Sequence, residues 1–236
     1  MKMPNLGRAL ILLLSFVFLV SCCNKSGFIE NAFSAKSSPV PKESVYFIVK
    51  KSFVQIENDE LELLAQSTGS GASVLSRKTH SNILTAGHVC IDMFNILASA
   101  VTYTLYDYKG QAAEATIVAV DPDSDLCLLQ IKRESTPLKL AKREMTSGDR
   151  VYYAGYPLGM YMPGSAHHFF GYFSGVDPYG YAMFSLPAAP GSSGSAIVNS
   201  SGELISVVSA VTSEFDNLTI GAGQERLYPF LAATNH

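Results

Sequence analysis

From Ser44 onward, short runs of apolar, aromatic and β-branched residues alternate with polar turns rich in Gly, Pro, Asn and Asp. Runs of this length and composition predict β-strands. In the first half of this region the expected strands are Val45–Val49, Phe53–Ile56, Leu61–Leu64, Ala72–Leu75, Asn82–Thr85, Val101–Tyr106, Ala113–Val120 and Leu126–Ile131. In the second half they are Val151–Ala154, His168–Phe173, Tyr181–Leu186, Ala196–Val198 and Leu204–Val211. The pattern favours an all-β fold, either a sandwich or a barrel.

Helical patterns are few in this region. A short turn is expected at His88–Phe94, and a terminal helix at about residues 223–232, around Gln224–Leu231. The polar segment 132–148 contains Pro137 and is typical of a connection between two halves. We therefore expect one domain over residues 44–236, with a first half at about 44–135 and a second at about 148–222.

The first 21 residues have the pattern of an export signal. Lys2 and Arg8 precede an apolar run, Ala9–Val20, which is too short for a comfortable membrane span. The run ends in Leu19–Cys22, which resembles the bacterial lipobox, and that resemblance implies cleavage before Cys22 and lipid attachment to its thiol. The alternative is an ordinary secretion signal. Residues 22–43 are rich in Ser, Lys, Asn and Pro and predict a flexible tether.

Composition narrows the possible functions. The chain is 47% hydrophobic and 16% charged, which is typical of a folded globular protein. Its net charge is −3 and it has no basic run, so nucleic-acid binding has little support. Its four cysteines include no C-x-x-C spacing, so we expect no zinc site, no other metal and no cofactor.

The segment with the clearest chemistry is Pro190–Asn199, a serine loop that runs into an apolar strand. Gly191 and Gly194 flank Ser192 and Ser193, so the backbone can turn tightly there. A serine hydroxyl is a weak nucleophile until a base takes its proton. The chain offers such a base in His88, and an acid that would orient the base in Asp125.

Three motifs, in the order His, Asp, Ser, resemble the chymotrypsin/trypsin-like serine peptidase family. The family's TAAHC is similar to Thr85–Cys90, its DLALL to Asp125–Leu129, and its GDSGG or GNSGG to Gly191–Ser195. The likeness is strongest to bacterial HtrA-like peptidases, and it spans roughly residues 45 to 232. Because the chain stops at His236, we expect no PDZ domain of the kind that HtrA-like proteases carry.

The resemblance implies two six-stranded β-barrels with the active site between them and a short C-terminal helix. It also implies that Ser193 is the nucleophile, that His88 is the base and that Asp125 orients the base. The backbone N–H groups of Gly191 and Ser193 would bind the oxyanion. The expected reaction is hydrolysis of peptide bonds in protein or peptide substrates through an acyl-enzyme.

Each role has a competitor among neighbouring residues. Ser192 competes with Ser193, but the family motif puts the nucleophile third in its five-residue frame. Asp121 and Asp123 compete with Asp125, but only Asp125 directly precedes an apolar strand. The other histidines are His80, His167, His168 and His236, and none has the context of His88. Ser195 departs from the family motif, which ends in glycine.

Specificity has a weaker signal. The position six residues before the nucleophile, which is an aspartate in trypsin, is Pro187, and Ala188 follows it. Ser209, Ala210 and Val211 would form the wall strand of the pocket. No carboxylate is present at these positions to pair with a basic side chain, so we expect a small or medium apolar side chain there. The aromatic-rich segment 160–170 is either barrel core or part of the cleft.

Cys90 and Cys127 each follow a proposed catalytic group by two residues. They are either bridged, as export permits, or two small buried apolar residues. The resemblance does not decide, because the family's cysteine near the histidine pairs elsewhere.

The sequence therefore predicts a serine endopeptidase at the bacterial cell envelope, on its periplasmic or extracellular face, or secreted if the anchor is not used. The alternative is a catalytically weak or inactive envelope lipoprotein that binds protein partners.

Overall fold

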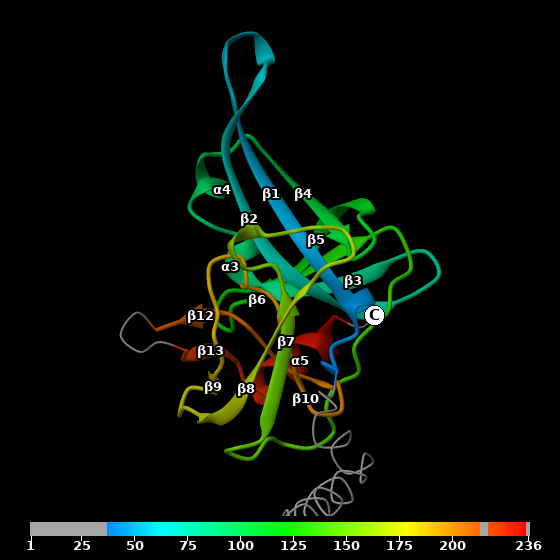
Figure 1. Cartoon of the computed structure of the whole chain (residues 1–236). Helices are drawn as coiled ribbons and strands as arrows, with labels where there is room; N and C mark the ends of the chain where they lie inside the picture. Colours follow the sequence, from blue (N-terminus) through cyan, green and yellow to red (C-terminus); the bar gives the residue numbers. More distant parts are fainter. Residues whose placement is uncertain (1–36, 213–216, 235–236) are drawn as a thin grey trace, which may run out of the picture. The chain divides into compact units, whose positions relative to one another are not determined.

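Six strands of the first half close into a barrel in the order β1–β2–β3–β6–β5–β4 (Figure 1). The structure is a computed structural model and describes residues 37–212 and 217–234. The barrel strands are β1 (Val45–Gln55), β2 (Leu61–Ser76), β3 (Ser81–Ala86), β4 (Ala100–Asp107), β5 (Ala112–Asp121) and β6 (Leu126–Ile131). The short helix η1 (Lys42–Ser44) precedes β1, and η2 (Glu57–Asp59), α3 (Gly87–Cys90) and α4 (Phe94–Leu97) lie in the connections between strands. The expected all-β architecture is confirmed.

Strand β6 is apolar along nearly its whole length because both of its faces are buried. Alternate side chains point to opposite faces of a strand. Cys127 and Leu129 belong to the core inside the barrel, whereas Leu126 and Leu128 belong to a second core. That second core also contains side chains from the other half of the domain, namely Ala154, Val198 and Leu204. The start of β6, where Asp125 lies, is therefore set where the two halves meet.

The second half is a seven-stranded sheet in the order β11–β10–β7–β8–β9–β13–β12. Its strands are β7 (Arg150–Gly155), β8 (His167–Val176), β9 (Tyr181–Ser185), β10 (Ala196–Asn199), β11 (Leu204–Val207), β12 (Ala210–Val211) and β13 (Thr219–Ala222), with η3 (Pro157–Gly159) after β7. The family resemblance implies six strands here, and the two-residue β12 is the seventh. The sheet curls so that β11 meets β13, where the Ser206 hydroxyl donates to the Ala222 carbonyl at 2.6 Å.

Helix α5 (Gln224–Ala233) follows the second sheet and buries Leu227 and Leu231 in the core between the halves. Within the described residues, no helix has the length and apolarity that a membrane span requires. The predicted signal peptide and most of the predicted tether lie outside the described residues. Residues 38–43 of that tether belong to the folded unit, because Val40 is buried in the same core.

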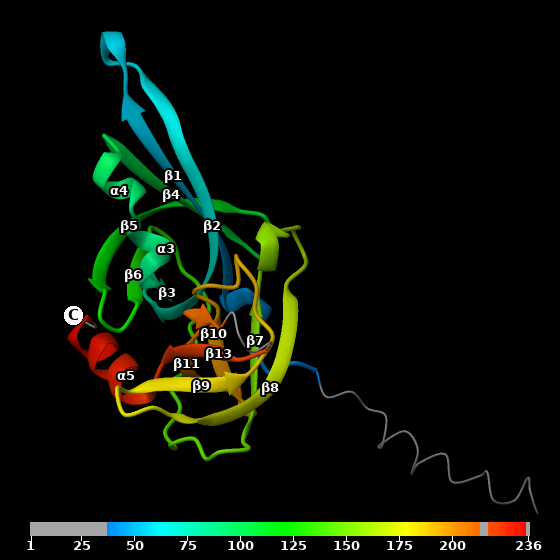
Figure 2. The same cartoon turned by 90° about the vertical axis from the view of Figure 1, so that its left-hand side faces the viewer.

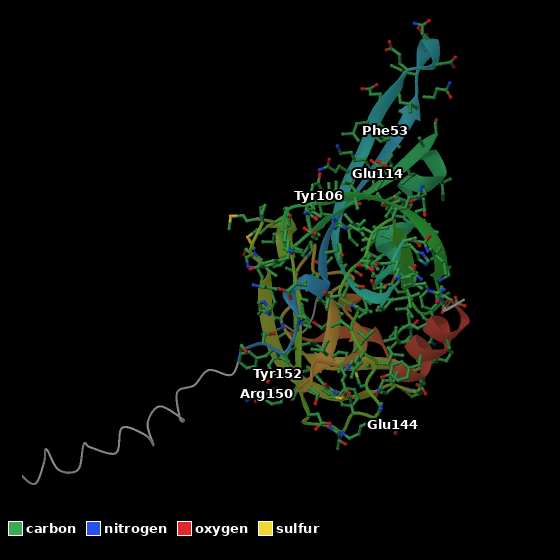
Figure 3. All side chains as sticks on the ribbon, turned by 90° about the vertical axis from the view of Figure 1, so that its right-hand side faces the viewer. Phe53, Tyr106, Glu114, Glu144, Arg150 and Tyr152 are labelled. Carbon is green, nitrogen blue, oxygen red and sulfur yellow. A yellow bond between two sulfur atoms is a disulfide. The ribbon has the colours of Figure 1, made fainter. Side chains whose placement is uncertain are left out.

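Strands β1 and β2 form a hairpin that extends well beyond the barrel (Figure 2). Phe53 lies on this projection, while Tyr152 and Arg150 lie near the far end of the second sheet (Figure 3). The sequence predicts breaks at residues 50–52 and 69–71, but both segments continue as strand. Lys50 is buried and pairs with Asp92 at 2.9 Å, so its charge does not mark a turn. Gly69 also lies within the strand, and position 69 is a glycine because a side chain there would collide with Val89.

Candidate active site

His88 and Asp125 are brought together by the pairing of β3 with β6. Ala86, the last residue of β3, pairs with Leu126, the first residue of β6. His88 follows Ala86 by two positions as the second residue of α3, and Asp125 directly precedes β6. The imidazole Nδ1 of His88 lies 2.9 Å and 3.1 Å from the two carboxylate oxygens of Asp125. An ionised carboxylate only accepts hydrogen bonds, so Nδ1 carries a proton, and the neutral form of the ring has its lone pair on Nε2.

The Asp125 carboxylate is held by further donors. The backbone N–H of His88 donates to Oδ1 at 2.8 Å, and the Ser209 hydroxyl donates to Oδ2. Burial alone would raise the pKa of Asp125, but the hydrogen bonds from His88 and Ser209 outweigh it and lower the pKa below its usual 3.8. The carboxylate therefore stays ionised at neutral pH and orients the imidazole.

The backbone around Asp125 has an unusual conformation. Its φ is +51°, in the left-handed region, which aspartate tolerates better than most residues. Gly87 lies against it, and a side chain at position 87 would meet Asp125 Oδ1 at 3.0 Å. The Ala-Gly-His segment thus needs its glycine to let the carboxylate reach both the N–H and the ring of His88.

The serine loop has its two glycines at positive φ, +90° at Gly191 and +86° at Gly194. A side chain at position 191 would meet the Tyr156 carbonyl at 2.7 Å. Among the described residues, the N–H groups of Gly191 and Ser193 donate to no protein acceptor. Neither of the predicted oxyanion donors is therefore occupied by an acceptor from the described part of the chain.

The two competing serines differ in their surroundings. Ser192 is fully buried, and its hydroxyl accepts from the Ala189 N–H at 3.3 Å. Ser193 is partly exposed, and its side chain has no hydrogen-bond partner in the described part of the chain, His88 included. Catalytic hydrogen bonds often tighten only when substrate binds. Of the two, only Ser193 is open to a substrate.

Ser70 ties the serine loop to the first barrel. Its N–H donates to the Ser193 carbonyl at 2.8 Å, and its hydroxyl donates to the Gly191 carbonyl at 2.8 Å. The same hydroxyl accepts from the Tyr156 N–H at 2.9 Å, while Thr85 donates to the Ser70 carbonyl at 2.7 Å. Ser70 is therefore linked to both proposed oxyanion residues, across the join between the halves.

Sequence reasoning missed this role of Ser70. The only signal for it in the sequence was a serine between two glycines, in Gly69–Gly71. The contact of Ser209 with Asp125 was also missed, since Ser209 was expected only as a pocket wall. No sequence pattern links two residues that lie 84 positions apart.

Ser195, which replaces the family glycine, is fully buried. Its hydroxyl packs where a side chain at Gly155 would otherwise lie, and it has no hydrogen-bond partner among the described residues. The chain therefore accommodates the departure through a glycine on β7.

The residues expected to line a specificity pocket lie on both sides of the serine loop. The Pro187 carbonyl accepts from the Tyr153 hydroxyl at 2.7 Å, which fixes the segment that carries Ala188. Ala210 and Val211 form the exposed edge strand β12. Ser209 turns its hydroxyl to Asp125, so that only its backbone remains for a pocket wall. Pocket lining thus stays a prediction for these residues.

The aromatic-rich segment is partly core and partly surface. Tyr161 stacks on Phe47 at 5.0 Å between ring centroids, and Phe169 stacks on Tyr153 at 4.8 Å. Met162 and Phe170 are exposed.

The structure joins Cys90 and Cys127 in a disulfide, one of the two alternatives that the sequence left open. Within residues 37–212 and 217–234, no group of three or more His, Cys, Asp or Glu side chains could hold a metal ion.

Comparison with known proteins agrees with this geometry. A family model described as a trypsin-like peptidase domain matches residues 69–207. An uncharacterized protein of Sinorhizobium fredii (strain NBRC 101917 / NGR234), y4bJ, is 32% identical over 108 residues, which is 44% of this chain and 17% of that protein. The chain thus spans less than a fifth of the length of this relative.

A solved structure, an HtrA-type protease AlgWS227A with decapeptide, is similar with a TM-score of 0.65 and 18% sequence identity. The match covers 82% of this chain and 64% of the solved one, and at this identity it shows the fold. The predicted chymotrypsin-like fold class is confirmed. The chain belongs to the trypsin-like peptidase domain family.

Proposed function

We propose that this protein is a serine endopeptidase that hydrolyses peptide bonds through an acyl-enzyme, with Ser193, His88 and Asp125 as its triad. The observation that carries the proposal is the imidazole of His88, which is held through Nδ1 by the Asp125 carboxylate, while no described residue bonds to its Nε2. Acyl transfer by a serine requires a base held in one tautomer and a serine hydroxyl that a substrate can reach.

The reaction follows from these groups. Ser193 Oγ attacks the scissile carbonyl as its proton passes to His88 Nε2, and the resulting oxyanion accepts from the N–H groups of Gly191 and Ser193. His88 then gives the proton to the departing amine, which leaves an ester on Ser193. A water molecule then attacks the ester carbonyl as its proton passes to His88. The bond to Ser193 Oγ breaks, the carboxylic acid product leaves, and His88 returns the proton to Ser193 Oγ.

The first experiment is labelling of the full chain, purified in detergent, with an alkyl fluorophosphonate that phosphonylates an activated serine. Wild type should be labelled, whereas Ser193→Ala and His88→Ala should not. Ser192→Ala is the matched control, because its buried hydroxyl should not react and labelling should remain. A folded wild type that stays unlabelled would contradict the enzyme proposal and support the alternative of a protein that binds partners.

The proposal places this activity at the cell envelope, through a lipid on Cys22. The support is the sequence of Leu19–Cys22, since this segment lies outside the described residues. Each buried CH₂ of an acyl chain contributes about 0.8 kcal/mol to membrane binding. Mass spectrometry of the membrane fraction should find an acylated Cys22. Cys22→Ala should release the protein from the membrane, and Cys23→Ala should not.

A further inference from the structure

The base of the proposed triad sits on a very short helix. Helix α3 has four residues, Gly87–Cys90, and it ends with a backbone hydrogen bond from the Ile91 N–H to the Gly87 carbonyl at 2.9 Å. The side chain of His88 is 47% exposed, so little packing holds the ring itself. The position of the imidazole against Asp125 therefore depends on how firmly the backbone of α3 is held.

The end of α3 is bonded covalently to the barrel. Cys90 and Cys127 are both fully buried and joined by a disulfide. Cys127 lies within β6 and is paired on both sides, with Thr85 of β3 and Val120 of β5. It is therefore part of a closed and rigid ladder, and Figures 1 and 2 both show α3 beside β6.

The geometry points to a function for this bridge beyond stability. Each cysteine follows a triad residue by two positions, so a single covalent link fixes the backbone of both His88 and Asp125. The Tyr103 hydroxyl donates to the Cys90 carbonyl at 2.6 Å and holds the same turn from inside the barrel. An isolated helical turn is intrinsically unstable. Without the bridge, α3 would keep only hydrogen bonds and packing.

We propose that the Cys90–Cys127 disulfide is a positioning element of the active site, which holds the His88 imidazole in register with the Asp125 carboxylate. The inference rests on the proposed function of these two residues. A displacement of about 1 Å in a catalytic group can reduce the rate about 10²-fold. Removal of the bridge should therefore slow acylation of Ser193 by a similar factor in protein that is still folded.

The test compares the rate of fluorophosphonate labelling in the full chain, wild type against Cys90→Ala/Cys127→Ala. The control is Ile205→Ala, which removes a buried side chain from the second half's own core. Both variants should lose thermal stability. At a temperature well below both unfolding transitions, the bridge variant should label about 10²-fold more slowly than wild type, and Ile205→Ala should label within about twofold of wild type.

A double-mutant cycle with Asp125→Asn separates positioning from general stability. If the bridge acts through the His88–Asp125 pair, its removal should barely change the labelling rate of protein that already carries Asp125→Asn. A stabilising role alone would give the same factor in both backgrounds, because effects of uncoupled sites add. Equal factors would overturn the inference.

Four other outcomes complete the test. Free thiols at Cys90 and Cys127 in non-reducing peptide maps of oxidised wild type would overturn it, as would an unchanged labelling rate in the folded bridge variant. If the double alanine variant does not fold, Cys90→Ala/Cys127→Val restores buried volume and takes its place. An unlabelled wild type would instead contradict the proposed function, so the two failures remain distinguishable.

Discussion

Asp125 concentrates more of the site's chemistry than any other single residue. It accepts from the His88 ring, the His88 N–H and the Ser209 hydroxyl, and it does so from a left-handed backbone conformation. The sequence predicted the residue because an apolar strand follows it. It could not predict Ser209 as a partner, because that contact depends on how the segment before β12 packs against the first barrel.

The lowered pKa of Asp125 makes a prediction about pH. A carboxyl whose pKa is lower in the folded state stabilises the fold above its unfolded pKa, about 3.9, and loses that contribution as the pH falls further. Asp125→Asn should therefore be less stable than wild type at pH 6, by a margin that narrows at pH 3. Urea unfolding at both pH values measures this margin, and a constant margin would contradict the prediction.

Asp125→Asn should also label about 10⁴-fold more slowly, because asparagine favours the wrong tautomer of His88.

Ser195 allows a prediction of increased stability, whereas replacement of Asp125 should decrease it. Its buried hydroxyl has no partner among the described residues, and such a group costs about 1–3 kcal/mol. Ser195→Ala should raise the free energy of unfolding by about 1 kcal/mol and leave labelling unchanged. The matched control is Ser206→Ala on β11, where the hydroxyl does have an acceptor, Ala222. Ser206→Ala should lower the free energy of unfolding by about 1 kcal/mol. The urea midpoints of Ser195→Ala and Ser206→Ala should therefore move in opposite directions from that of wild type.

At the scale of elements, the strand pattern predicted the all-β architecture, but it did not predict the lengths of β1 and β2. The segment Lys50–Ser52 has the polarity of a turn, yet Lys50 and Ser52 are buried inside β1. Polarity alone does not reveal that a partner such as Asp92, 42 positions away, will neutralise the charge of Lys50. Likewise the glycines of Gly69–Gly71 read as a break, although they lie in β2 and allow the serine loop to approach.

Strand β2 also carries the contact that holds the serine loop. Ser70→Ala should remove the hydroxyl bonds to the Gly191 carbonyl and from the Tyr156 N–H. Losing one oxyanion donor outright typically costs about 10²–10³ in rate. Since Ser70 only positions such a donor, we expect labelling about tenfold slower. Ser67→Ala, on the exposed part of the same strand, is the control and should label as wild type. Equal rates for both variants would show that the loop holds its own shape.

At the scale of the whole domain, the site exists only where the two halves meet. His88 and Asp125 come from the first barrel, and Ser193 and Ser209 come from the second half. The three motifs, their order and the resemblance were enough to predict this division. The contacts across the join were not predictable, because Ser70, Tyr156 and the core that surrounds them come together only through long-range packing.

Two neighbouring leucines of β6 test whether that join sets the activity. Leu128 packs in the core between the halves, whereas Leu129 packs inside the first barrel. Each is almost completely buried, so Leu128→Ala and Leu129→Ala should both lower the free energy of unfolding by about 2–5 kcal/mol. At a temperature where both remain folded, only Leu128→Ala leaves a cavity at the join across which the proposed triad is assembled. It should therefore label more slowly than Leu129→Ala. If the two variants label equally, the halves are aligned by the hydrogen bonds of Ser70 and Ser209 and not by the packing of the shared core.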